Sequence, residues 1–268
     1  MMSDHSAPPP VEIRSSACKV GYLRSMLAMR WYIDHGRDDS AAMSIGRLAH
    51  MAILQPDRKP PVWTGGRRAG AEWDAFCSDH AGEETYTQAE NETAKAIAAA
   101  VYANPDAADL LSGTQRELPI SWPDGHGGTC GTRIDAWKAG VLIDVKTARE
   151  IGRRDMGWTA RRMGYDVQFG FMRWGLAALK IGPQAPACWI VAVENKPPYD
   201  CACYRIDPMQ IAEGQAAAYE TVERFRACER VGKYPGVSPG REMLTLPPRQ
   251  TDETATPPAE VGAAEELG

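Results

Sequence analysis

The chain has 268 residues, of which 44% are hydrophobic and 24% charged, so it is long enough and apolar enough to bury a core of its own. This composition excludes collagen-like and largely unfolded chains, and no stretch approaches the roughly 18 consecutive apolar residues of a membrane span. The formal net charge of −5 argues against a nucleic-acid partner unless basic residues gather locally. Much of the negative charge lies in the final segment, which begins at Arg249.

The cysteines and the N-terminus predict an intracellular protein. The chain has seven cysteines, an odd number, and none of them forms a CxxC pair. This usage is typical of free thiols in a reducing compartment. The first residues lack the basic and apolar regions of a signal peptide. We therefore expect a cytoplasmic protein with no membrane segment.

The first half of the chain is predicted to be helical. Apolar residues recur at helical spacing, and Pro56 and Pro105 mark helix boundaries. We expect a flexible N-terminus over residues 1–14. The predicted helices span residues 15–34, 40–55, 73–80, 87–103 and 105–111.

From residue 115 onward the pattern changes to strands alternating with helices. Residues 187–193 are a continuous apolar run, the pattern of a buried strand. The other predicted strands are 115–122, 129–138, 141–147 and 201–206. The predicted helices are 152–180, broken near Gly164, and a last one that Asp207 caps and that ends near residue 231.

This order predicts an α/β fold, with a central mixed β-sheet flanked by helices. We predict a single domain over residues 15–246. It would combine a helical part at 15–112 with an α/β core at 113–232. The remaining residues, 247–268, are predicted to be a disordered acidic and Pro-rich tail.

Two strands around Ala139-Gly140 carry a set of charged residues. If these two residues form the loop of a hairpin, Asp135 lies directly across from Asp144. Lys146 shares that face, because side chains alternate along a strand. The opposite face would be apolar and would point into the core, with Ile134, Ala136, Ile143 and Val145.

The two carboxylates of this hairpin suggest a metal site. Like charges directly opposite each other are destabilising, and a divalent cation between them would relieve that cost. Hard oxygen ligands favour Mg²⁺ or Mn²⁺. The ammonium of Lys146 could then orient a water or neutralise charge on a phosphate. The alternative is a solvated hairpin face whose acids pair with Arg133 and Lys146.

The order of Asp135 and Asp144-x-Lys146 resembles the signature of the PD-(D/E)xK nuclease superfamily. The fuller pattern is similar to its RecE-type branch (exonuclease VIII C-terminal domain) and to the RecB-like nucleases. Upstream, Gly46-Arg-Leu-Ala-His50 supplies a histidine on a predicted helix, and downstream Tyr165-Asp-Val-Gln168 follows Lys146. The resemblance covers roughly residues 15–232.

The resemblance implies a role for each matching residue. Asp135, Asp144, His50 and the backbone carbonyl of Val145 would be metal ligands. Lys146 would serve the attacking water. Glu117 would assist at the metal site, and Gln168 and Tyr165 would lie near the scissile strand. Some RecB-like nucleases have a tyrosine four residues after the glutamine, where this chain has Met172; its tyrosine, Tyr165, comes before the glutamine instead.

Arginines after Lys146 predict a local DNA contact that the overall charge conceals. They are Arg153, Arg154, Arg161 and Arg162, on the helix that follows the hairpin. Arg67 and Arg68, in a glycine-rich loop, are further candidates. The alternative for the helix is a solvated face. No base-reading motif is visible, so binding would be to backbone and ends.

The resemblance implies a phage or prophage exonuclease of the RecE type, acting in a bacterial host cell with Mg²⁺ or Mn²⁺. It would degrade linear double-stranded DNA from the 5′ end and leave 3′ single strands for an annealing partner of the RecT type. It also implies a homo-oligomer. Two alternatives remain: an endonuclease or single-strand-specific nuclease of the same fold, and a catalytically inactive DNA-binding relative.

Overall fold

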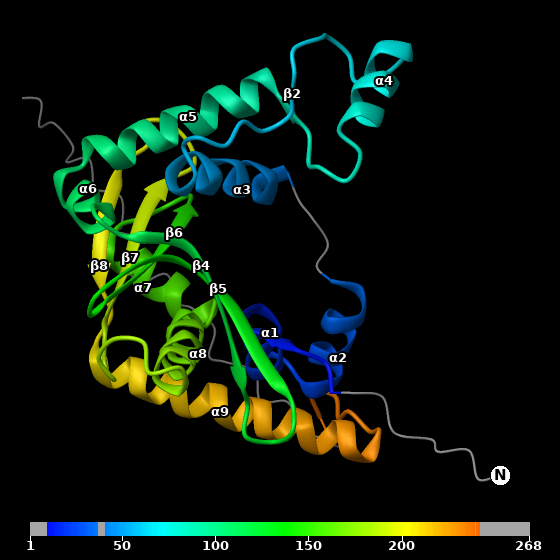
Figure 1. The fold of residues 1–268 in the computed structure, drawn as a ribbon, viewed down its shortest axis with the longest axis vertical. Coiled ribbons are helices and arrows are strands. Elements are labelled where there is room, and N and C mark those ends of the chain that lie inside the picture. Colours follow the sequence, from blue (N-terminus) through cyan, green and yellow to red (C-terminus); the bar gives the residue numbers. More distant parts are fainter. Residues whose placement is uncertain (1–9, 37–40, 239, 242–268) are drawn as a thin grey trace, which may run out of the picture. The chain divides into compact units, whose positions relative to one another are not determined.

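The structure is a computed structural model, and it describes residues 10–36, 41–238 and 240–241. Up to Val237 the chain forms one compact unit around a mixed sheet (Figure 1). The strands of this sheet are β1 (Ile13–Arg14), β4 (Gln115–Pro123), β5 (Thr129–Lys138), β6 (Val141–Ala148), β7 (Ala187–Glu194) and β8 (Cys201–Arg205). β5 pairs with β1, β4 and β6, and the sheet continues through β7 to β8. The β1–β5 and β6–β7 pairs are parallel and the others antiparallel.

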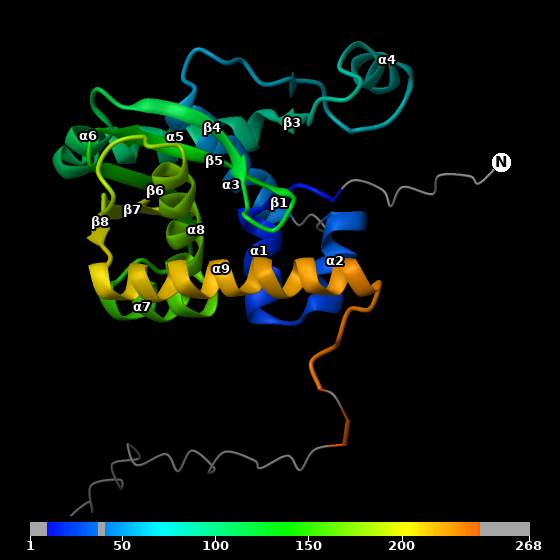
Figure 2. The same ribbon diagram turned by 60° about the horizontal axis from the view of Figure 1, so that its bottom comes forward.

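Helices cover both faces of the sheet. The helices are α1 (Ser15–Leu23), α2 (Met26–His35), α3 (Ala41–Leu54), α4 (Ala71–Asp79), α5 (Gln88–Ala103), α6 (Pro105–Leu111), α7 (Arg153–Arg162), α8 (Tyr165–Ala178) and α9 (Pro208–Val231). One hydrophobic cluster joins the sheet to α1, α2, α8 and α9, and the other joins it to α3, α5 and α6. Figure 2 shows α9 running along α8 and α1, which it contacts. The predicted α/β fold, with a helical N-terminal region, is confirmed.

A small lobe interrupts the helical region between α3 and α5. Two short parallel strands, β2 (Val62–Trp63) and β3 (Tyr86–Thr87), hold it together, and α4 lies between them in the chain. None of the α4 residues is buried. The predicted helix over 73–80 is therefore present, whereas the two strands were not predicted.

The hairpin of β5 and β6 has the predicted register. Ala136 lies opposite Ile143 and Lys138 opposite Val141, with a turn at Ala139-Gly140 in which Gly140 has φ 83°. A positive φ of this kind costs glycine nothing, and it suits a tight hairpin turn. Both faces of the hairpin are buried, however, because Trp137 and Leu142, on the face of Asp144, belong to a hydrophobic cluster of their own.

The prediction that Ile134 shares the apolar face of Ala136 is wrong. Ile134 packs in the cluster with α8, whereas Ala136 packs in the cluster with α3. The change falls at Asp135, opposite Glu117, where the pairing of β4 with β5 is interrupted. Glu117 has φ 52°, a left-handed conformation that is uncommon for a side-chain-bearing residue. This local irregularity changes the direction of the side chains along β5 at Asp135, where Glu117 and Asp135 lie opposite each other.

The helix predicted over residues 15–34 is two helices. Arg24 leaves the helical region, with φ −129° and ψ −81°. The hydroxyl of Ser25 then accepts the backbone N–H of Ala28 at 3.1 Å and caps α2. Serine is one of the preferred capping residues because its oxygen satisfies an otherwise unpaired N–H. The helical periodicity runs through this break, so the pattern alone did not reveal it.

The later predicted elements are confirmed. The break near Gly164 separates α7 from α8, and Gly164 has φ 62°. Asp207 caps α9 by accepting the backbone N–H of Met209 at 2.7 Å. The start predicted at Ser40 for the second helix lies outside the described residues. All seven cysteines are free thiols, as expected. Among the described residues no helix has the length and apolarity needed to cross a membrane.

The two ends of the chain are described only in part. β1 lies within the segment 1–14 that was predicted to be flexible, and Ile13 is fully buried. Beyond Val237 a second unit is described only at Ser238, Gly240 and Arg241. Residues 1–9 and the predicted disordered tail over 247–268 lie outside the described residues.

Two glycines let α8 and α9 approach each other closely. A Cβ atom on Gly214 would overlap the Asp166 carbonyl, and one on Gly170 would overlap the backbone of Gln215. We expect Gly214→Ala to lower the free energy of unfolding by roughly 2–3 kcal/mol, because the two helix backbones must separate. Gly157→Ala on α7, where a Cβ would meet open space, should instead be neutral or stabilising. Urea unfolding of both variants checks this, and equal stabilities would contradict it.

Candidate functional site

Three ligand-type side chains meet where α3 crosses the sheet. His50 Nε2 lies 2.8 Å from Oδ2 of Asp135, and His50 Nδ1 lies 3.3 Å from Oε1 of Glu117. One ligand atom from each residue falls within 4.8 Å of the others. Gly46, one turn before His50, brings α3 close to β6, since a Cβ there would lie 3.1 Å from the Thr147 hydroxyl. The structure therefore brings three predicted site residues from α3, β4 and β5 together.

Asp144 and Lys146 form the second part of the site. The Lys146 ammonium is ion-paired with Oδ2 of Asp144, and Gln168 Nε2 donates to Oδ1 of Asp144 at 2.6 Å. Asp144 is only 1% exposed. The backbone N–H of Val145 donates to Asp135 at 2.8 Å, which ties the two parts of the site together. Asp135 and Asp144 thus sit on neighbouring strands as predicted, but their carboxylates have different partners.

Lys19 is a site residue that the sequence analysis missed. Its ammonium donates to Oε1 of Gln168 at 2.7 Å. Lys19 and Lys146 both lie over the ring of Tyr165, at 5.6 and 4.9 Å from its centre. Nothing in the local pattern marks Lys19, because its link to α8 is made only when α1 folds against that helix.

The charges of the site are strongly coupled. Burial raises the pKa of Asp144, and the neighbouring Asp135 adds to this, although Lys146 acts against it. Burial opposes ionisation of Asp135 as well, but His50 and Lys146 outweigh it and lower its pKa. Burial opposes the charge of His50 and of Lys146, yet the acids around them raise both pKa values. The negative charge of Glu117, Asp135 and Asp144 therefore stabilises a cation that lies among them.

This donor set fits a divalent cation. His50, Glu117 and Asp135 offer one imidazole nitrogen and two carboxylate oxygens, and Asp144 lies beside them on the adjacent strand. Carboxylates suit Mg²⁺ and Mn²⁺, and imidazole is a general ligand for transition metals. A cation bound there would balance the negative charge of the acids, as a proton on His50 does without it. The residues present thus fit a metal of this type.

The site opens to the surface through two adjoining hollows. One, of about 570 Å³, is lined by His50 and Lys146, and the other, of about 620 Å³, by Arg162 and Tyr165. Both include Thr147. The two hollows therefore meet at the residue that follows Lys146.

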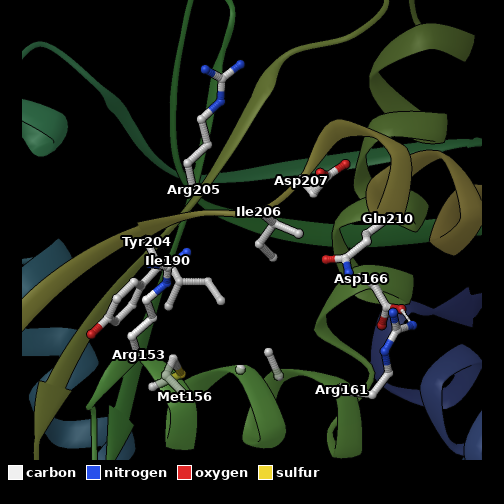
Figure 3. A pocket seen from close by; sticks show the side chains of 12 residues that line it. Arg153, Met156, Arg161, Asp166, Ile190, Tyr204, Arg205, Ile206, Asp207 and Gln210 are labelled. Atoms are coloured by element: carbon white, nitrogen blue, oxygen red, sulfur yellow. Dashed lines mark hydrogen bonds and ion pairs between the residues drawn. The ribbon is translucent and has the colours of Figure 1, made fainter.

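The arginines predicted to contact DNA do not share one surface. Arg162 lines the hollow beside Tyr165. Arg153 and Arg161 line a different pocket, between α7 and β8 (Figure 3), where Arg161 pairs with Asp166 at 2.6 Å. Arg154 is exposed. Their role in DNA binding stays a prediction.

The structure also gives the positions of the other residues named in the sequence analysis. Arg68 is paired with Glu90 at 3.1 Å and lies over the Trp73 ring. Arg67 lies in the same lobe, and both arginines are exposed. Met172 is 1% exposed and packs in the core, which explains why this position does not supply a site residue. Val145 packs in the other hydrophobic cluster.

Comparisons with known proteins agree on the fold. A family model described as a PDDEXK-like domain of unknown function (DUF3799) matches residues 24–245. A candidate exonuclease from Eubacterium rectale, at 16% identity, aligns over 91% of this chain and 93% of its own with a TM-score of 0.61. A phage-related exonuclease from Haemophilus somnus 129PT, at 11% identity, aligns over 82% and 95% with a TM-score of 0.36, which is too low to support an argument. No curated protein sequence matches the chain.

Proposed function

Because the chain belongs to the DUF3799 family of PDDEXK-like domains, we propose that it is a metal-dependent nuclease that hydrolyses phosphodiester bonds in DNA. The observation that carries this proposal is the meeting of His50, Glu117 and Asp135 beside the Asp144–Lys146 pair. Fold alone does not define an activity, and it is this set of side chains that suits phosphodiester hydrolysis.

In the proposed reaction, each group of the site has a task. His50, Glu117, Asp135 and Asp144 would hold the metal. A bound divalent cation supplies a Lewis acid and favours ionisation of water. Lys146 would donate to the attacking water or to a phosphate oxygen and so offset negative charge in the transition state. Water forms the new bond to phosphorus and gives up a proton, the bond to one nucleoside oxygen breaks, and that oxygen takes up a proton.

From the sequence resemblance we infer the substrate, the direction of digestion and the partners of this nuclease. The protein would act as an exonuclease on ends of linear double-stranded DNA, from 5′ to 3′ and with Mg²⁺. It would leave 3′ single strands for an annealing protein of the RecT type. It would work as a homo-oligomer in the cytoplasm of a bacterial host. The RecE-like order of His50, Glu117, Asp135, Asp144, Lys146 and Gln168 supports this.

Digestion of end-labelled linear duplex tests both levels of the proposal. With Mg²⁺, we expect release of a 5′ label before a 3′ label and no cleavage of covalently closed circles. Cleavage of the circles would replace the exonuclease by an endonuclease, and cleavage of single strands only would define a single-strand nuclease. Tight DNA binding without cleavage under Mg²⁺ or Mn²⁺ would contradict the nuclease and favour an inactive DNA-binding relative.

Metal binding is expected to stabilise the fold. At about a hundredfold excess over the dissociation constant, a bound ion adds roughly 2.7 kcal/mol, which raises Tm by several degrees in a protein of this size. We expect Mn²⁺ to raise the Tm of wild type but not of Asp135→Asn. Glu213→Gln, an exposed acid of α9, should respond like wild type. A shift that survives in Asp135→Asn would place the ion elsewhere.

Lys19 is expected to position Gln168. An ammonium only donates and a carboxylate only accepts, so Lys19 and Asp144 together fix which end of the Gln168 amide faces the acid. We expect Lys19→Met to lower the cleavage rate about tenfold with little change in Tm, and Lys19→Arg to retain most activity. Lys95→Met, at an exposed lysine of α5, is the matched control. An equal rate for Lys19→Met and wild type would exclude this role.

A further inference from the structure

A cationic groove lies between α1 and α2, next to the candidate site. Its volume is about 360 Å³, at the lower end of the range for small-molecule sites. That size suits one nucleotide. The side chains that determine its chemistry are Lys19, Leu23, Arg24, Trp31, Tyr32 and Met163.

The groove combines positive charge with exposed apolar surface. Lys19 and Arg24 line it, and none of the described lining residues is acidic. Trp31 is 49% exposed and Leu23 is 43% exposed. His35 stacks on the Trp31 ring, with centroids 4.9 Å apart and planes 17° from parallel, and so helps to hold the indole in place. Large apolar side chains this accessible, gathered in one hollow, suggest a bound ligand.

The groove adjoins the candidate site. Met163 lines both this groove and the hollow beside Tyr165. Lys19, in the groove, donates to Gln168, which in turn donates to Asp144. A strand held at the candidate site would therefore have the groove beside it.

We propose that this groove binds an unstacked nucleotide of single-stranded DNA adjoining the bond that is cut. In this arrangement Trp31 stacks on the base, and Lys19 and Arg24 contact the neighbouring phosphates. A duplex would present phosphates but keep its bases stacked inside, so the apolar side chains would gain nothing from it. Cationic grooves with stacking aromatics are the usual means of holding single strands. The substrate class rests on the proposed function.

Binding without cleavage tests the groove separately from catalysis. The full chain in EDTA is titrated against a fluorescent oligothymidine of about ten nucleotides and against a blunt hairpin duplex, with anisotropy as the readout. Loss of one stacked base should weaken single-strand binding about tenfold in Trp31→Ala, and Trp31→Phe should stay close to wild type. Duplex binding should be the same in all three proteins.

Further variants sharpen the test. Tyr22→Ala removes an aromatic residue that is 45% exposed on α1 but does not line the groove, so it should bind like wild type. Arg24→Gln should lower the slope of log affinity against log salt by about 0.7, the value for one phosphate contact to a single strand.

Three results would contradict the proposal that the groove binds a nucleotide. They are unchanged single-strand binding in Trp31→Ala, an equal loss of affinity for duplex in that variant, or an equal loss of single-strand affinity in Tyr22→Ala. Mg²⁺-dependent cleavage of linear duplex is measured in parallel. Cleavage together with unchanged binding in Trp31→Ala would reject the groove and leave the nuclease standing. Single-strand binding that depends on Trp31, without any cleavage, would support the groove and reject the nuclease.

Discussion

Replacing Asp144 with asparagine is expected to reduce DNA cleavage by at least about a thousandfold while leaving the protein folded. Asp144 is the acid of the site that contacts Lys146 and Gln168 directly. The amide keeps the size of the side chain but removes the negative charge that would hold a cation and orient the Lys146 ammonium. Losing one preorganised electrostatic contact in an active site costs about a hundredfold to a thousandfold, and here two functions depend on the same carboxylate.

The stability of this variant should change little. Burial raises the pKa of Asp144, so the fold already disfavours the charged form relative to the unfolded chain. An uncharged amide removes that cost but also removes the ion pair with the Lys146 ammonium, which offsets the gain. We expect a free energy of unfolding within about 1 kcal/mol of wild type.

Initial rates of nucleotide release from labelled linear duplex, together with thermal melts, check the prediction. Asp109→Asn, an exposed acid on α6, should cleave like wild type. A variant at Asp144 that is folded and still cleaves at the wild-type rate would remove the carboxylate from the mechanism, and with it the proposed site.

The hairpin shows how much of the site was predictable. A strand alternates its side chains with a period of two, so the Ala139-Gly140 turn alone fixed the pairing of β5 with β6. The family order then added His50, Glu117 and Gln168, and the structure brings all three to Asp135 and Asp144. The placement of these residues was predictable because each depends on local geometry or on an ordered motif, whereas their roles stay predictions.

The parts that were missed depend on tertiary contacts. Glutamate is not a turn former, so the positive φ of Glu117 could not be inferred. The capping role of Ser25 depends on a break that helical periodicity does not show. Lys19 enters the site only because α1 packs against α8, more than a hundred residues along the chain.

The arginines illustrate a further limit of periodicity. Arg154 and Arg161 are seven residues apart in the sequence and are therefore expected on the same helix face, but the spacing does not say what that face meets. In the structure α7 has a hollow on each side, so Arg162 lies beside the candidate site and Arg153 and Arg161 lie in the other pocket (Figure 3). Any DNA path along α7 therefore has fewer cations available than the sequence suggested, and Lys19 and Arg24 are the natural additions.

A buried arginine far from the site should dominate stability. Arg226 on α9 is 2% exposed, and its Nε donates to Asp124 at 2.6 Å. Its guanidinium also donates to the carbonyls of Val11 and Thr129, at 2.8 and 3.1 Å, and is ion-paired with Glu229. One side chain thus joins α9 to the N-terminal segment and to the β4–β5 turn.

Arg226→Met is expected to lower the free energy of unfolding by about 3–5 kcal/mol, because Asp124, itself 1% exposed, would be left as a buried charge without its partner. For a protein of this size that corresponds to a fall in Tm of roughly 10 °C. Arg224→Met, at an exposed position of the same helix, should stay within about 0.5 kcal/mol of wild type. Equal stabilities of the two variants would contradict the role of Arg226.

The effect of Arg226→Met should also depend on pH. Burial opposes ionisation of Asp124, but the backbone N–H groups of His126 and Gly128 and the Arg226 guanidinium outweigh it, so the pKa of Asp124 is lowered. A lowered pKa contributes stability that is complete above the unfolded value, near 3.9, and is lost as the pH falls through the folded value. Arg226→Met lacks part of this contribution, so the gap in Tm between it and wild type should be widest near pH 7 and should narrow below about pH 4. Thermal melts across this range measure the gap, and a gap that widens as the pH falls would show that the Asp124–Arg226 pair is not its cause.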